Sequence, residues 1–254
     1  MALVLNVMRE NLRSRVLYLV TGIGLLLLML LLMGGGSVTS DGQSLTADTQ
    51  GLMRVGFAVL GMLGSIVTVM LAMNTIPREF ERGTIHLLLV RPVARWQLAL
   101  AFLGANILTA WIFLALLSIP LFGGLILRGE AGQVGALLVA LLGMALNTAM
   151  IAGLTTLFSS RMPGAAAAFL GILCYGLGAF GSTLSLLVAT WEGAKGALAQ
   201  AGLLLLPPTA AITNELVKLF AIGRELDLRV FVTGLIYLWV VAGLTVLGLH
   251  RREV

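Results

Sequence analysis

Charged side chains are scarce in this chain of 254 residues: they make up 11% of it, whereas 59% of the residues are hydrophobic. The mean hydropathy is +1.04. Soluble globular domains carry about 25% charged residues, so this composition excludes an ordinary soluble fold and indicates an integral membrane protein. Because no long polar tract interrupts the apolar sequence, we expect one membrane domain over residues 1–254 and no separate soluble catalytic domain.

Cysteine and histidine are nearly absent. The single cysteine, Cys174, lies in an apolar run, so one chain can form neither a disulfide nor a cysteine-based metal site. The two histidines, His86 and His250, lie in regions expected at the membrane surface and suggest no metal site. The eleven methionines are explained by apolar packing. We therefore expect no metal, no cofactor and no catalytic residue in this chain.

The sequence also lacks its own source of energy for transport. It contains no GxxxxGK[ST] motif, so it has no phosphate-binding loop for ATP. None of its apolar runs carries an acidic or basic residue near the middle, where ion-driven carriers place one. An intramembrane protease is disfavoured because Ser182 has no histidine in another apolar run to act as its base. Active transport would need energy from a partner.

Six charge-free runs are long enough to cross a bilayer, which requires about 20 residues. An all-α fold of six transmembrane helices follows, with spans near residues 16–36, 55–77, 98–127, 134–158, 164–190 and 230–249. An even number of spans puts both termini on one side. With the termini in the cytoplasm, ten arginines lie inside; six basic residues, Arg54, Arg128, Lys195, Lys218, Arg224 and Arg229, lie outside. The net charge of +5 is then a topology signal and an attraction to anionic lipid, with no nucleic-acid partner required.

Two segments outside the spans are predicted to lie along the membrane. Near the N-terminus Leu5, Met8 and Leu12 recur at helical spacing, which predicts an interfacial helix. The alternative, a secretory signal peptide, is disfavoured because the apolar run is longer than such peptides use. Segment 191–229 contains Pro207 and Pro208, which argue against a seventh span, so we expect a re-entrant element followed by an amphipathic outer helix.

One charge-rich stretch between two spans has the features of a cytoplasmic docking element: segment 78–97, REFERGTIHLLLVRPVARWQ. Pro77 suits the end of the second span, and Gly83 a helix stop. Thr84 can cap a short helix over residues 85–90 that Pro92 closes. The simpler interpretation is a basic loop that only fixes topology, but two acids have no use in such a loop.

This stretch resembles the permease subunits of type-2 ABC exporters, and within them the small permeases of nitrous-oxide-reductase maturation. The resemblance rests on the acids, the Gly-Thr pair, a leucine-rich short helix, and then proline and arginine. It implies that the following residues couple the chain to an ATPase subunit: Glu79, Glu81, Gly83, Thr84, Leu88, Pro92 and Arg95. Many members carry a Gly-Lys pair near the start of the third span, where this chain has Ala101 and Phe102, and this difference leaves the subfamily open. Gly104 still agrees with the family pattern in this region.

The resemblance further implies a six-span permease of a bacterial inner membrane. It would pair with a second permease subunit, identical or related, and with two copies of a cytoplasmic ATPase subunit that bind ATP and Mg²⁺. Because the predicted spans contain few charged residues, we expect the cargo to be a lipid, a drug or another amphipathic molecule. A channel or a structural membrane scaffold without ATP coupling is the alternative, because apolar helices and basic loops suit these as well.

The fifth predicted span is rich in small residues that permit close helix approach or bending. Gly176, Gly178, Gly181 and Ser182 are the residues expected at a gate or subunit interface, with simple helix packing as the alternative. Four polar side chains within the predicted spans are expected to form hydrogen bonds to neighbouring helices rather than to substrate: Asn106, Thr109, Asn147 and Thr148.

Overall fold

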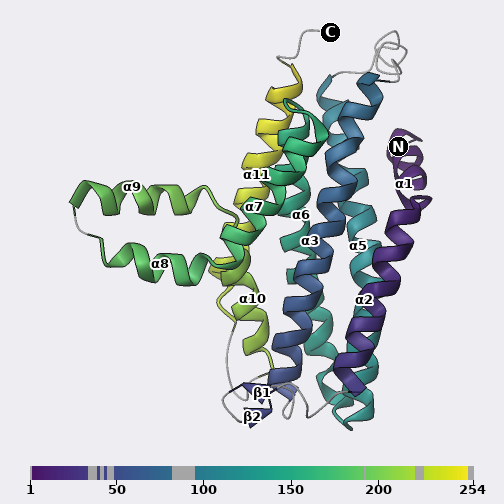
Figure 1. Ribbon diagram of the computed structural model, residues 1–254, viewed down its shortest axis with the longest axis vertical. Helices are drawn as coiled ribbons and strands as arrows, with labels where there is room; N and C mark the ends of the chain where they lie inside the picture. Colours follow the sequence, from purple (N-terminus) through teal and green to yellow (C-terminus); the bar gives the residue numbers. More distant parts are fainter. Residues whose placement is uncertain are drawn as a thin grey trace.

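The structure, a computed structural model, describes residues 2–33, 39–40, 43–44, 49–81, 95–191, 193–220 and 226–250. Within these ranges the predicted all-α fold is confirmed: there are ten α-helices, arranged mostly as an upright bundle (Figure 1). The exception is a small antiparallel hairpin of β1 (Thr39–Ser40) and β2 (Gln43–Ser44), which the sequence pattern did not predict.

The bundle is built from helices that lie roughly parallel to its long axis: α2 (Arg15–Met33), α3 (Thr49–Glu81), α5 (Arg95–Leu127), α6 (Val134–Ser159), α7 (Gly164–Ala179) and α11 (Leu228–His250). Helices α3 and α6 make the most extensive pairing, and both also pack against α5 and α7. A short 3₁₀ turn, η1 (Ala131–Gln133), precedes α6. Gly129, with φ of +75°, permits the tight turn after α5.

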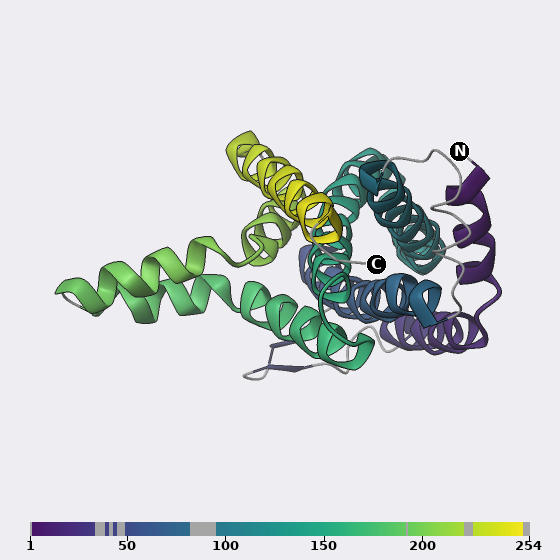
Figure 2. The same ribbon diagram turned by 90° about the horizontal axis from the view of Figure 1, so that it is seen from above.

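The other helices depart from the bundle axis. Helix α1 (Ala2–Leu12) meets α2 at a bend of 62° and packs against α5. Helices α8 (Gly181–Ala189) and α9 (Gly193–Leu204) form a pair that projects sideways from the bundle, which we call the lateral arm (Figures 1 and 2). Helix α10 (Thr209–Lys218) returns the chain to the bundle and packs on α3, α6 and α7.

Four helices are long and apolar enough to cross a membrane: α3, α5, α6 and α11. Three bent helix pairs, α1 with α2, α7 with α8 and α9 with α10, raise the number to as many as seven if each counts as one span. The predicted six spans fall within this range. The chain is therefore a multi-span membrane protein by helix length and hydropathy.

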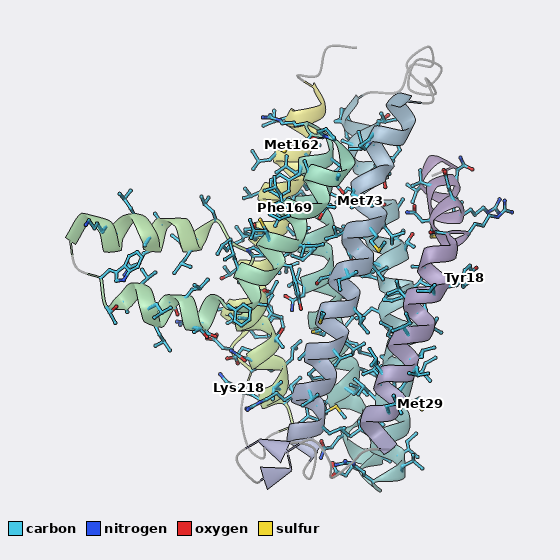
Figure 3. The ribbon with its side chains drawn as sticks, viewed as in Figure 1. Tyr18, Met29, Met73, Met162, Phe169 and Lys218 are labelled. Atoms are coloured by element: carbon cyan, nitrogen blue, oxygen red, sulfur yellow. The ribbon has the colours of Figure 1, made fainter. Side chains whose placement is uncertain are left out.

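Apolar side chains fill the bundle and also cover its outside. The largest core cluster joins α3, α5, α6 and α10 through residues such as Phe57, Leu117 and Leu216. Outward-pointing side chains include Tyr18 and Met29 on α2 and Phe169 on α7, all exposed (Figure 3). In water this surface would be costly, whereas hydrocarbon accommodates it, so the exposed apolar belt fits a lipid-facing bundle.

Basic residues lie at both ends of the bundle. Helix α1, the end of α3, the start of α5, the turn after α6 and the end of α11 all lie at one end of the molecule (Figure 1). We call this the terminal end and the opposite one the distal end. Among the described residues Arg9, Arg13 and Arg161 lie at the terminal end. Arg54 and Arg128, near the start of α3 and the end of α5, lie at the distal end.

Two predicted spans differ from the helices in detail. Residues 164–190 were expected to form the fifth span, and they form α7 and α8, which meet at a bend of 65° at Phe180 so that α8 leaves the bundle as part of the lateral arm. The candidate span in α3 ends at Pro77, as predicted, but the helix itself continues through this proline to Glu81. A proline removes one backbone donor, and the remaining hydrogen bonds of a long helix can carry it past such a site.

Candidate functional site

The predicted coupling residues fall largely beyond what the structure describes. Gly83, Thr84, Leu88 and Pro92 lie in the segment 82–94, outside the described residues, as does the short helix predicted over residues 85–90. Glu79 and Glu81 belong to the last turn of α3, and Arg95 is the first residue of α5. The coupling role of all seven residues stays a prediction.

The predicted gating residues lie where two helix breaks cross. One break separates α7 from α8 at Phe180, and the other separates α9 from α10 at residues 205–208. The backbone of Gly178 touches the second break: a Cβ atom at this position would lie 2.6 Å from the carbonyl oxygen of Pro207 and 2.8 Å from the Oγ1 atom of Thr209. Only glycine allows this approach.

The neighbouring small residues have different surroundings. A Cβ atom added to Gly176 or Gly181 would meet nothing within 4 Å. Ser182 is exposed in the first turn of α8. Three of the four residues, Gly178, Gly181 and Ser182, line a cavity beside the crossing, whereas Gly176 does not. The role of these four residues at a gate or subunit interface stays a prediction.

The cavity, which we call the distal pocket, has a volume of about 750 Å³. Its walls come from α7 and α8, from α9 with the following turn, from α10 and from α11, and Arg54 of α3 contributes to the lining. Tyr237 of α11 secures one side, because its hydroxyl group donates a hydrogen bond of 2.9 Å to the carbonyl oxygen of Leu205. The two breaks and the last helix are thereby held together around the pocket.

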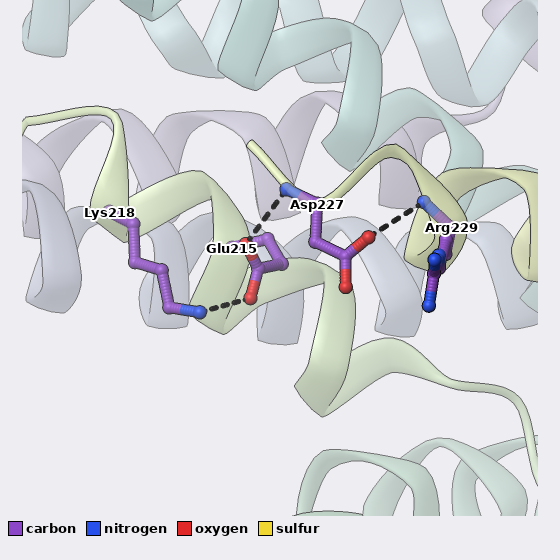
Figure 4. Close-up of polar contacts among 4 residues, drawn as sticks. All are labelled: Glu215, Lys218, Asp227 and Arg229. Carbon is purple, nitrogen blue, oxygen red and sulfur yellow. Dashed lines mark hydrogen bonds and ion pairs between the residues drawn. The ribbon is translucent and has the colours of Figure 1, made fainter. Parts of the chain in front are cut away.

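An ion pair lies in the wall of the distal pocket (Figure 4). The Nζ atom of Lys218 donates to Oε1 of Glu215, one helical turn earlier in α10. The second carboxylate oxygen, Oε2, accepts a hydrogen bond of 3.4 Å from the backbone N–H of Asp227. The side chain of Glu215 is only 10% exposed, whereas that of Lys218 is 39% exposed. Both oxygens of the buried carboxylate therefore have a donor.

The burial of Glu215 corrects the prediction of an amphipathic helix with its polar face in water. Ile212, Leu216 and Phe220 do pack into the core, as the apolar stripe indicated. Glu215 was assigned to the polar face, but position 215 is three residues after Ile212 and four before Leu219, which is the same face. This spacing in the sequence could have indicated that Glu215 lies on the buried face of the helix. Arg54 was also missed, since nothing in its own segment points to a pocket made by distant helices.

A second polar cluster lies near the terminal end. Asn106 of α5 is fully buried, and its Oδ1 atom accepts a hydrogen bond of 3.2 Å from Nδ2 of Asn11 in α1. The hydroxyl group of Thr75 in α3 lies 3.0 Å from the same oxygen, and Nδ2 of Asn106 is 3.5 Å from Oγ1 of Thr156 in α6. One amide therefore connects four helices.

The predicted interhelical bonds were right for the asparagines and wrong for the threonines. Asn147 of α6 donates a hydrogen bond of 3.2 Å to Oγ1 of Thr213 in α10. Thr109 and Thr148 instead donate to carbonyl oxygens of their own helices, those of Ala105 and Ala145. A threonine hydroxyl reaches the carbonyl of the preceding turn easily, whereas the longer asparagine amide projects to a neighbour.

Comparison with protein-family models and with curated proteins finds no match for this sequence. Within the described part of the chain, no group of three or more His, Cys, Asp and Glu side chains lies close enough to hold a metal ion. The properties shown are therefore those of a helical multi-span membrane protein with a distal pocket beside two crossed helix breaks.

Proposed function

We propose that this chain is the membrane-spanning permease subunit of an ATP-driven exporter. A separate cytoplasmic ATPase would dock on segment 78–97, and the chain would move a lipid, drug or other amphipathic cargo across the membrane. The proposal depends on the resemblance of that segment to the coupling region of type-2 ABC exporters.

One structural observation supports this function above the others: helix α3 connects the predicted docking segment to the distal pocket. It is continuous over 33 residues, which corresponds to about 50 Å. Glu79 and Glu81 belong to its terminal end, and Arg54 near its distal end lines the pocket. Helix α3 packs on α2, α5, α6, α7 and α10. A displacement applied at its terminal end would therefore be transmitted to its distal end.

The division of labour follows from this arrangement. ATP and Mg²⁺ would be bound by the partner ATPase, and this chain would contribute no catalytic group. Closure of an ATPase dimer on ATP would pull on the segment between α3 and α5, the two longest helices described. Motion of α3 against α7 would then alter the crossing at Gly178 and the shape of the pocket. A second permease subunit, identical or related, would complete the transporter.

The docking segment can be tested by purification from native membranes. The tagged chain, extracted in mild detergent, is expected to retain a soluble ATPase and its nucleotide hydrolysis. Replacing both acids, Glu79→Gln with Glu81→Gln, is expected to reduce the retained ATPase by about tenfold or more, because interface charges with lost partners weaken binding strongly.

The control is Glu130→Gln, which removes an acid at the distal end, between α5 and η1. This variant should retain the ATPase at the level of the native chain. Purification of the native chain without any ATPase, or full retention by the double variant, would favour a channel or scaffold instead.

A further inference from the structure

The distal pocket has two chemically different walls. One is apolar and includes Leu203, Leu204 and Leu206 at the end of α9 and in the turn after it. The other carries polar groups from three helices: Arg54 of α3, Ser182 of α8, and Asn214 and Lys218 of α10. A ligand that fills this space must have an apolar part and a polar part.

The polar wall carries an excess of positive charge. Of the lining residues, three are charged: Arg54, Glu215 and Lys218. Both oxygens of the Glu215 carboxylate already accept hydrogen bonds, one from Lys218 and one from the backbone of Asp227. The exposed guanidinium of Arg54 and the partly exposed ammonium of Lys218 outnumber this single acid. The polar wall therefore suits an anionic group. One guanidinium group can donate two parallel hydrogen bonds to two oxygens of a phosphate.

The pocket extends from the apolar interior toward the distal end of the bundle. Gly178 lies fourteen residues after Gly164, the first residue of α7 at the terminal end, which corresponds to about 21 Å of a hydrocarbon core of about 30 Å. The charged groups lie nearer the headgroups of the distal leaflet, because Arg54 is the sixth residue of α3, which begins at the distal end, and Lys218 is the last residue of α10 (Figures 1 and 3). Leu204 is 82% exposed, so the apolar wall continues onto the lipid-facing surface. In Figure 3 Lys218 lies on the side from which the lateral arm projects.

We propose that the distal pocket binds an anionic phospholipid from the leaflet on the distal side. The phosphate would lie between Arg54 and Lys218, with Asn214 and Ser182 as further donors. The acyl chains would follow Leu203, Leu204 and Leu206 into the bilayer. A volume of about 750 Å³ falls within the range of about 300–1,000 Å³ that small-molecule sites occupy.

This inference does not depend on coupling to an ATPase. The residues that carry it line the distal pocket, and Glu79 and Glu81 at the terminal end are not among them. A lipid could bind here in a permease, a channel or a scaffold. Loss of the ATPase in the purification described above would leave this proposal standing, and absence of lipid binding would leave the docking segment unaffected.

The test uses the purified full chain in detergent, titrated with phosphatidylglycerol or phosphatidylcholine and observed by native mass spectrometry. Phosphatidylglycerol is expected to bind at least about tenfold more tightly, since each basic residue near an anionic headgroup contributes severalfold. The double variant Arg54→Gln with Lys218→Gln should lose this preference while phosphatidylcholine binding stays unchanged. The charge-preserving pair Arg54→Lys with Lys218→Arg should keep it.

The control variant is Arg128→Gln, which removes a cation at the distal end that does not line the pocket. It should bind phosphatidylglycerol as the native chain does. Equal binding of the two lipids by the native chain, or an undiminished preference in the double variant, would overturn the proposal. So would competition by glycerol phosphate at the concentration of the lipid, because the site would then recognise a free anion.

A second measurement needs no substitution at all. A phosphatidylglycerol carrying a photoactivatable group in its acyl chain is bound to the native chain, illuminated and located by peptide mass spectrometry. Labelling of residues 203–218 that unlabelled phosphatidylglycerol suppresses, and phosphatidylcholine does not, is the expected result. Labelling spread over the other helices without such competition would contradict the site even if the double variant failed to fold.

Discussion

At residue 178 a side chain of any size meets the backbone of another segment. The close neighbour is the carbonyl oxygen of Pro207, which cannot rotate away as the tip of a leucine can. Gly176, one half-turn earlier on the same helix, has open space at the corresponding position. The two glycines therefore provide a matched pair in which the same substitution should have opposite effects.

We expect Gly178→Ala to destabilise the protein by about 1–3 kcal/mol, the usual cost of overpacking a filled site. Gly176→Ala should be neutral or stabilise by up to about 1 kcal/mol, because alanine favours the helix more than glycine does. Thermal unfolding of both variants in the same detergent measures the difference. Equal unfolding temperatures would mean that the crossing of the two breaks is not tight.

Residue-level reasoning could find unusual composition, but it failed where distant segments meet. The small residues Gly178, Gly181 and Ser182 stood out because their type and density are unusual in an apolar run; they line the pocket, and their role at a gate or subunit interface stays a prediction. The burial of Glu215 was missed although its spacing from Ile212 showed it. Arg54 could not have been placed from sequence, since the pocket that it lines is built from α7 to α11, far along the chain.

At the scale of elements, helix α1 is attached to the bundle by an apolar cluster and by one buried amide. Val7 packs with Phe102 and Ile76 in a small cluster, and Asn11 bonds to Asn106 behind it. The sequence predicted an interfacial helix here from its apolar stripe. It did not predict that α1 would also be fixed to α5 and, through Asn106, to α3 and α6.

Replacement of Asn106 by leucine is expected to loosen α1. The change leaves the Asn11 amide without its hydrogen-bond acceptor, and an interhelical hydrogen bond of this kind contributes about 1 kcal/mol. The free energy of local opening of α1 should fall by that amount, so its amide hydrogens should exchange about fivefold faster. Hydrogen–deuterium exchange of residues 2–12 measures it. Thr109→Val is the control, because this buried hydroxyl bonds only within α5. Similar exchange of α1 in both variants would show that the hydrogen bond between Asn11 and Asn106 does not hold α1 in place.

Helix lengths and types were largely predictable, because charge-free runs of sufficient length specify membrane helices. The break at Phe180 was not, since the run from Gly164 to Thr190 contains no charge and no internal proline. What accompanies the bend is a contact between Gly178 and Pro207, which lie far apart in the sequence. The break at Pro207 and Pro208 was predictable, because two prolines remove two backbone donors.

For the whole molecule, the basic residues that flank the predicted spans along the sequence are what predicts its orientation, because basic residues near membrane helices favour the cytoplasmic side. In the structure α1 and the end of α11 lie at the same end of the bundle (Figure 1). The side of the membrane on which they lie remains a prediction.

Cysteine labelling tests the orientation directly. In a Cys174→Ser background, Gly132→Cys in η1 should react with an impermeant maleimide on intact cells, because it lies at the distal end with open space around it. Met162→Cys, in the exposed turn between α6 and α7, should react only after the cells are permeabilised. The reverse pattern would show that the termini face outward.

Cys174 itself makes the chain convenient for spectroscopy. It is the one thiol, it is partly exposed, and it precedes Gly178 by about one helical turn on α7. A spin label attached there reports on the crossing of the two breaks without any substitution. A complex containing two copies would carry exactly two such labels and give one interprobe distance, whereas pairing with a cysteine-free relative would give none.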